Sequence, residues 1–293
     1  MGGKAIQSSR PIKQFEIPST YKKIIEDVLI PLGLTEDQYT ILGSAGKKAN
    51  LCDTSGDLDI GIYSPKVAET LNCDFSVVLH MLEGHLQRLG YETYLTVGFG
   101  LVSFGFPIQS LDEGIVQVDL ILSDSIEWAK FANYSPDFRK GESRFKGLYR
   151  NALLAEIALN TIYSEIRNEN GDLVEIDRLA ISLARGLLRI KNSYIGKSGN
   201  LIKTANRSSN VVVTTDPQEL VNILCGECFT PEDMNSYESI RTVIDNPKFK
   251  LYEKREKILK GFAEGINDRS FPIPWDLLDL KSFIIGEYVE TFL

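Results

Sequence analysis

Hydrophobic residues recur with two different spacings along the chain, and the prevailing spacing changes near its middle. Before Asp124, alternating or β-branched stretches predict strands, and apolar residues three or four apart predict helices. The predicted helices are residues 20–32 and 75–89, and the predicted strands are residues 39–42, 58–63, 91–97, 101–106 and 115–122. The first half of the chain is therefore expected to be mixed α/β.

Beyond Asp124 the helical spacing prevails. Two helix starts are well marked, because Asp216-Pro217 and Thr230-Pro231 each combine an N-cap residue with a proline at the first helical position. A short apolar run at 211–213 fits either a strand or a buried loop. The predicted helices are residues 144–166, 176–194, 217–224, 231–244, 251–266 and 275–292.

These patterns predict an α+β protein in two parts. Residues 1–142 are expected to form a mixed β-sheet domain with flanking helices. Residues 143–293 are expected to form an α-helical domain. A segment with Pro136 and Gly141 separates the two parts.

Composition places the chain among globular proteins of a reducing compartment. It has 293 residues, 43% of them hydrophobic. It lacks the run of about 18 apolar residues that a membrane helix needs, and its polar start lacks an apolar signal region, so a cytoplasmic protein without membrane association is expected. Four cysteines do not make a disulfide framework. Cys225 and Cys228 have the spacing of half a zinc site, but His80 and His85 lie far away, which favours ordinary thiols.

The net charge of -8 argues against nucleic-acid binding by bulk electrostatics. Positive charge is nevertheless concentrated between Arg178 and Arg207, a segment with seven basic and no acidic residues. On the predicted helix, a narrow polar stripe would interrupt an apolar circumference. This stripe would either line a cleft or form salt bridges with the acidic remainder of the protein. Its members are Arg178, Ser182, Arg185 and Arg189.

Three aspartates form the strongest candidate site. Asp57 and Asp59, two apart on a predicted strand, project from one face about 7 Å apart along the chain and can share a cation site. Asp119 lies opposite the apolar face of its own strand and shares its face with Gln117. A carboxylate in so apolar a strand should face a cleft or a cation, or else pair with a buried arginine.

Spacing tests other interpretations of the segment around Asp57. A Walker P-loop would need four residues between the glycines, whereas Gly43 and Gly46 are separated by two. An EF-hand beginning at Asp53 would need glycine where Leu58 stands. A simple Asx-turn at residues 55–57 stays possible, but it accounts for neither the Gly-Ser turn at residues 43–44 nor Asp59.

The segment from residue 41 to 122 resembles the DNA polymerase β-like nucleotidyltransferase superfamily. The resemblance rests on a hydrophobic residue followed by Gly43-Ser44, twelve further residues, Asp57-Leu-Asp59-Ile, and Asp119 about 60 residues later. With a helical domain after the third acid, the layout is similar to class I CCA-adding and poly(A) polymerases and to phage-encoded nucleotidyltransferases. For a phage protein the expected location is the host cytoplasm.

The resemblance implies transfer of a nucleoside monophosphate from a nucleoside triphosphate to an acceptor, with release of pyrophosphate. Asp57 and Asp59 would bridge two Mg²⁺ or Mn²⁺ ions, and Asp119 would hold the second ion and help deprotonate the acceptor hydroxyl. Gly43 would let the backbone approach the phosphates, and the Ser44 hydroxyl would donate to them. The two lysines that follow, Lys47 and Lys48, either add positive charge or are simply solvated.

Basic residues of the second half are expected to complete the nucleotide site. Ser143 is the predicted N-cap of a helix on which Lys146 and Arg150 share a face, and Arg185 and Arg189 belong to the polar stripe. The acceptor stays open between an RNA 3′ end such as tRNA, which the basic segments favour slightly, and a small molecule or protein. A non-catalytic nucleotide-binding or assembly module is the alternative from another class. The base and the oligomeric state are also open.

Overall fold

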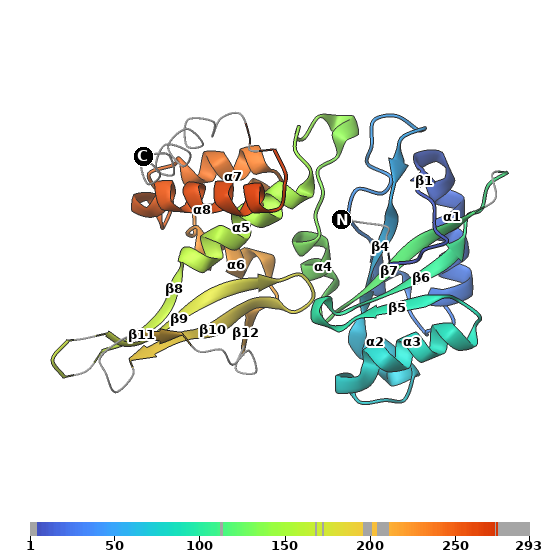
Figure 1. Ribbon diagram of the computed structural model, residues 1–293, viewed down its shortest axis with the longest axis horizontal. Helices are drawn as coiled ribbons and strands as arrows, with labels where there is room; N and C mark the ends of the chain where they lie inside the picture. The colour runs from blue at the N-terminus through green and yellow to red at the C-terminus, as the bar shows by residue number, and fades with distance from the viewer. Residues whose placement is uncertain are drawn as a thin grey trace, which may run out of the picture. The chain divides into compact units, whose positions relative to one another are not determined.

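The computed structural model describes residues 5–111, 114–167, 169–171, 173–195, 201–203, 211–272 and 274. The helix predicted at 275–292 lies outside them. The chain divides into two compact units. The first comprises Met1–Gly147, Ser182–Gly186 and Thr215–Pro217, and the second comprises Leu148–Ile181, Leu187–Thr214 and Gln218–Leu293. Several sheets and helices make up the fold, so the predicted α+β class is confirmed (Figure 1).

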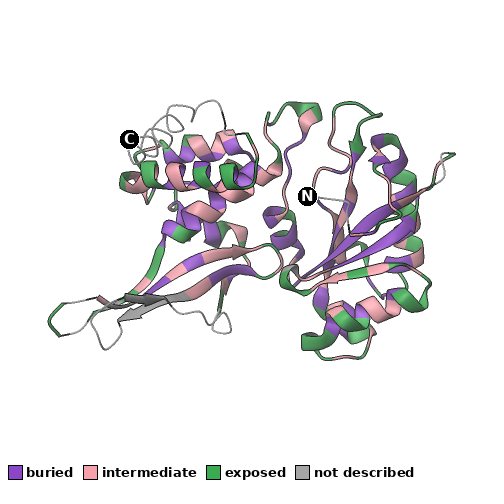
Figure 2. Cartoon of the chain, viewed as in Figure 1, coloured by how far each residue is buried: buried purple, intermediate pink, exposed green. Residues whose placement is uncertain are grey.

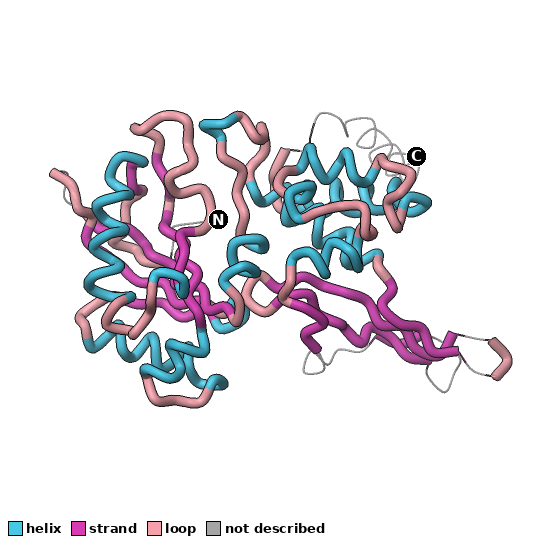
Figure 3. The backbone as a smooth tube through the Cα atoms, turned by 180° about the vertical axis from the view of Figure 1, so that it is seen from behind, coloured by secondary structure: helices cyan, strands magenta, loops and turns pink. Residues whose placement is uncertain are grey.

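A five-stranded sheet forms the centre of the first unit, in the order β2-β4-β7-β6-β5. Strands β4 and β7 are parallel, and the other neighbours are antiparallel. The strands are magenta in Figure 3, with helices around them. All five correspond to strands predicted from the sequence, and their bounds are β2 Tyr39–Ile41, β4 Asp57–Tyr63, β5 Thr93–Thr96, β6 Leu101–Pro107 and β7 Ile115–Ser123. A further short pair joins β1 (Ile12–Lys13) to β3 (Thr54–Ser55).

The two faces of this sheet are covered differently. One face packs its alternating apolar residues against helices α1 (Ile17–Ile24), α2 (Ser64–Thr70) and α3 (Val78–Arg88) to form the main core. The other face is partly covered by α4 (Ile126–Ala132) through a small cluster of Leu42, Ile121 and Ala129. The central strands β4, β6 and β7 are largely buried (Figure 2). Polar side chains are thus left to the second face.

The second unit combines helices with another sheet. Its helices are α5 (Gly147–Asn160), α6 (Pro217–Leu224), α7 (Tyr237–Ile244) and α8 (Arg255–Asp268). Its strands are β8 (Ile162–Arg167), β9 (Leu173–Ser182), β10 (Gly186–Ile195), β11 (Leu201–Lys203) and β12 (Val211–Thr214). The order is β11-β10-β9-β8, and β12 also pairs with β10. Residues 211–213, for which the sequence allowed a strand or a buried loop, belong to strand β12. No described helix has the length and hydropathy to cross a bilayer.

The predicted helix at 176–194 is wrong, because these residues belong to the neighbouring strands β9 and β10. Gly186, with φ of +117°, ends the turn between them, and the Ser182 hydroxyl accepts a hydrogen bond from the Arg185 N–H inside it. Strand pairing with β8 and β12 overrides a helical spacing of moderate strength. The α-helical domain expected for the second half therefore also contains a sheet, and the expected arginine stripe is wrong.

Candidate metal centre

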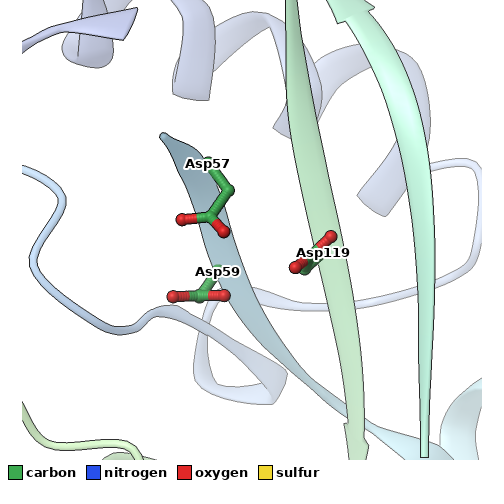
Figure 4. A group of neighbouring side chains, drawn as sticks. All are labelled: Asp57, Asp59 and Asp119. Carbon is green, nitrogen blue, oxygen red and sulfur yellow. The ribbon is translucent and has the colours of Figure 1, made fainter. Parts of the chain in front are cut away.

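The structure brings together the three aspartates that the sequence singles out. Asp57 and Asp59 project from β4, and Asp119 projects from the parallel neighbour β7, directly in register with Asp59. One carboxylate oxygen from each lies within 4.8 Å of the others. Figure 4 shows the three side chains gathered across two adjacent strands.

Strand alternation explains why these carboxylates share a face. Leu58 and Ile60 are fully buried in the core beneath the sheet, and Val118 and Leu120 are their counterparts on β7. Successive side chains of a strand point to opposite faces, so the intervening aspartates must emerge on the other side. The apolar residues thereby fix the direction of the acidic ones.

The cluster is electrostatically strained. Burial, reinforced by the neighbouring Asp57 and Asp119 carboxylates, raises the pKa of Asp59 to about 8. Burial also raises the pKa of Asp119, which is 8% exposed, although hydrogen bonds from Ser103 and Gln117 oppose the shift. A divalent cation would relieve this repulsion, and an all-oxygen donor set suits hard ions such as Mg²⁺ or Mn²⁺. The residues present therefore fit a metal ion.

Two neutral groups orient Asp119. Gln117 Nε2 donates to Asp119 Oδ1 over 2.9 Å, and Ser103 on β6 stands opposite Asp119 and bonds to its carboxylate. Sequence reasoning placed Gln117 on this face but missed Ser103. A signal was present, because Val102 and Phe104 are apolar on either side of it. Alternation alone would have placed Ser103 on the polar face.

The turn after β2 passes directly over Asp59. Gly43 has a φ of +63°, and a Cβ built there would lie 2.4 Å from Asp59 Oδ2. Only glycine therefore allows the backbone to run this close to the carboxylate. The Gly43 N–H donates to the Asn133 carbonyl over 3.3 Å, while the Ser44 hydroxyl has no hydrogen-bond partner within the described part of the chain. Within this turn, the Ser44 hydroxyl is therefore in a position to donate a hydrogen bond to a bound group.

Lys47 and Lys48 hold the loop that contains this turn. Lys47 Nζ donates to the Ser135 carbonyl over 2.8 Å and lies 4.7 Å from the centre of the Tyr134 ring. Lys48 Nζ donates to the Thr54 carbonyl. Both ammonium groups are engaged by loop atoms, so neither is merely solvated.

The residues expected at the next helix have different surroundings. Ser143 is not the N-cap, because its hydroxyl accepts from the Phe145 N–H and α5 begins only at Gly147. Lys146 is exposed and belongs to the first unit. Arg150 lies in the second unit, is 1% exposed, and donates from Nε to the Met234 carbonyl. Its guanidinium contributes to packing there.

Arg185 and Arg189, the last two residues predicted for the nucleotide site, also have different surroundings. Arg185 is exposed in the turn Ser182–Gly186, which Trp128 fixes to the first unit by donating from Nε1 to the Ser182 carbonyl over 3.0 Å. Arg189 lies on β10 and donates from Nε to Asp177 Oδ2 over 2.7 Å. For Arg189 the structure therefore shows the salt bridge that was the alternative to a cleft.

Comparisons with known proteins add a likeness in structure but none in sequence. No family model matches the chain, and no curated protein resembles it in sequence. Among solved structures, it is similar to Leishmania infantum polymerase beta, described as a ternary P/T complex, with a TM-score of 0.38 and 17% identity over 78% of each chain. At this level of similarity, function has to be inferred from the site itself.

Proposed function

We propose that the protein is a metal-dependent nucleotidyltransferase of the polymerase β-like kind. It would move a nucleoside monophosphate from a nucleoside triphosphate to an acceptor hydroxyl and release pyrophosphate. The observation that carries this proposal is the convergence of Asp57, Asp59 and Asp119 within 4.8 Å on one face of the sheet. The glycine turn pressed against Asp59 supports it, since such turns bring backbone close to phosphate groups.

The three aspartates have two different roles in this proposal. Asp57 and Asp59 would hold the cation on the triphosphate side, and Asp119 would hold it on the acceptor side and orient the attacking hydroxyl. A divalent cation bound there would neutralise phosphate charge and activate the acceptor oxygen. Phosphoryl transfer depends mainly on such positioning and charge stabilisation, which three fixed carboxylates can provide.

The remaining polar residues would act around this centre. The Ser44 hydroxyl would donate to a phosphate oxygen beside Gly43. Lys47 and Lys48 would hold the loop and contribute a positive field. The exposed Lys146 and Arg185 of the first unit would contact the triphosphate or the acceptor. Ser143, Arg150 and Arg189 would instead stabilise their own parts of the fold, since each is bonded to the chain itself.

Two acceptor classes are compatible with this site. We keep an RNA 3′ end, such as that of tRNA, as the first acceptor to test. The predicted arginine stripe does not form and gives no support for RNA. Support for RNA comes instead from exposed basic residues of the first unit, Lys130, Lys140, Arg144 and Lys146. A small molecule or a protein hydroxyl is the second acceptor class to test.

The decisive experiment measures label transfer. Purified protein is incubated with each α-labelled nucleoside triphosphate, Mg²⁺ or Mn²⁺, and total RNA, and the products are separated on denaturing gels. We expect metal-dependent transfer from one or more triphosphates, lost in Asp57→Asn, Asp59→Asn and Asp119→Asn. Transfer that persists in all three variants would contradict the mechanism. Metal-dependent triphosphate binding without transfer to RNA, protein or small-molecule acceptors would favour a non-catalytic binding module.

A further inference from the structure

The segment formed by residues 5–10 lies against the sheet face that carries the aspartates. Ile6 is 1% exposed, and its Cγ2 would be 3.2 Å from a Cβ built on Gly105. Gly105 stands opposite Gln117 in the antiparallel pair of β6 and β7. Farther along, the Arg10 N–H donates to the Ile115 carbonyl over 2.8 Å. The segment is therefore packed beside the strand of the third aspartate.

Gln117 connects this segment to the acidic cluster. Its Oε1 accepts hydrogen bonds from the backbone N–H groups of Ala5, over 2.7 Å, and Ile6, over 3.2 Å. Two N–H donors can be satisfied only by the carbonyl end of an amide. The NH₂ end must then point away from the segment, where it donates to Asp119 Oδ1 over 2.9 Å. Because Gln117 is only 3% exposed, water cannot easily substitute for either partner.

We propose that Gln117 is a positioning residue for Asp119, and that the Ala5 and Ile6 amides hold it in its working orientation. The residues near the start of the chain thereby become part of the metal centre. This inference rests on the metal-binding role proposed above for Asp119. A neutral amide is suited to the task, because it fixes the direction of the carboxylate without cancelling the charge that a cation requires.

The expected effect concerns metal affinity. Groups that hold a metal ligand by hydrogen bonding typically change metal affinity by about 10- to 100-fold when they are removed. Replacing Gln117 by methionine keeps an unbranched side chain of similar length and removes both halves of the amide. Ala5→Pro leaves Gln117 in place but deletes one of its two N–H donors, since proline has none. Ala5→Ser keeps that N–H and serves as the matched control.

The test titrates the full chain with Mn²⁺ alone and follows the free ion by electron paramagnetic resonance. Wild type, Gln117→Met, Ala5→Pro, Ala5→Ser and Asp119→Asn are compared, with the unfolding temperature of each recorded. We expect Gln117→Met to bind Mn²⁺ about 10-fold more weakly than wild type. Ala5→Pro should shift in the same direction by a smaller factor, and Ala5→Ser should match wild type. In turnover assays, the Mg²⁺ concentration for half-maximal activity should rise in the same order, whereas merely structural damage would lower the rate at every Mg²⁺ concentration.

The outcomes separate this inference from the proposed function. If wild type shows no specific Mn²⁺ binding, the metal centre itself is refuted, and if it binds Mn²⁺ no better than Asp119→Asn, the ligand role of Asp119 is refuted. If wild type binds and both Gln117→Met and Ala5→Pro match it, the positioning role is refuted while the metal centre stands. If only Gln117→Met weakens binding, the N-terminal segment has no part in holding the amide and the proposal is overturned in that form.

Discussion

Two buried aspartates, Asp119 in the first unit and Asp177 in the second, occupy similar places and have opposite surroundings. Both lie on inner strands of five-stranded sheets and are 8% and 1% exposed, respectively. Asp177 accepts from the Arg189 guanidinium over 2.7 Å and from the Ser164 hydroxyl over 2.9 Å. Within the described part of the chain, Asp119 accepts hydrogen bonds from the neutral groups of Gln117 and Ser103 and stands beside two further carboxylates.

This difference distinguishes a carboxylate compensated within the chain from one that, in the proposed function, an external cation compensates. A buried carboxylate costs free energy unless an opposite charge or hydrogen bonds compensate it. Asp177 receives its opposite charge from the chain itself. The Asp119 cluster instead concentrates negative charge and raises the pKa of Asp59 to about 8, with burial as the main cause. Such an arrangement is costly in the free protein and favourable once a cation binds.

The largest expected effect is on activity. Asp119→Asn removes a proposed cation ligand, and we expect it to lower metal-dependent transfer by on the order of 1,000-fold. Asp177→Asn should leave the specific activity of the folded protein within about threefold, since its partner Arg189 would stay on a half-exposed strand position. Initial rates normalised to the folded fraction test both. Equal losses in the two variants would show that the comparison between the aspartates is mistaken.

The next effect is on stability and concerns the second unit. Arg189→Met leaves Asp177 buried without its cation, and we expect the free energy of unfolding to fall by about 2 to 3 kcal/mol. This is below the usual cost for a fully buried pair, because the Arg189 side chain is 43% exposed. Arg178→Met is the matched control on the adjacent strand and should change stability by less than about 0.5 kcal/mol. Urea unfolding monitored by circular dichroism gives both values.

The first unit could be predicted well because local pattern and tertiary surroundings agree there. Its strands alternate apolar and polar residues, as Leu58 and Ile60 do around Asp59, and one face is buried as the pattern requires. The same agreement appears locally in the second unit, where Asp216-Pro217 marks a helix start and the helix begins where expected. Motif spacing also identified the three acids that the fold brings together.

The remaining features depend on contacts that a local pattern does not encode. The apolar residues of β9 and β10 satisfy helical spacing as well as strand pairing, and only partners such as β8 decide between them. Gly186 was the local sign against a helix. In the site, Gln117 is held by the backbone amides of Ala5 and Ile6, and such backbone contacts cannot be recognised from the residue types. The salt bridge of Arg189 likewise needed the strand register to become visible.

A smaller effect should appear in the pH dependence of the metal-free protein. Asp59 has a pKa of about 8 in the folded state against 3.8 in the unfolded chain. Between these values the folded state keeps a proton that the unfolded chain has lost, so stability should fall as pH rises from about 4 to 8, by at most about 1.4 kcal/mol per pH unit. Glu16 and Asp137, with pKa values lowered from 4.5 and 3.8 to about 2, act in the opposite direction and mainly below pH 5.

Unfolding in urea across this pH range, with EDTA present, measures the slope. Asp59→Asn should reduce it, and the part that is left should belong chiefly to Asp119 and Glu156, whose pKa values burial also raises. Mg²⁺ should flatten the wild-type slope, because it binds the deprotonated cluster. Stability that rises with pH in this window would contradict the strained state of the acids.

The smallest effect compares the two serines that donate to the two aspartates. Ser164→Ala removes one donor from Asp177, and we expect a loss of about 1 kcal/mol, since Arg189 still bonds to the carboxylate. Ser103→Ala should cost less than about 0.5 kcal/mol without metal, because Gln117 still donates to the Asp119 carboxylate, whose pKa is raised by burial. With Mg²⁺ present, Asp119 is held charged, so the cost of Ser103→Ala should approach that of Ser164→Ala. Urea unfolding with EDTA and with Mg²⁺ separates the two cases, and a Ser103→Ala cost that ignores Mg²⁺ would mean that Asp119 is as fully compensated by the chain as Asp177.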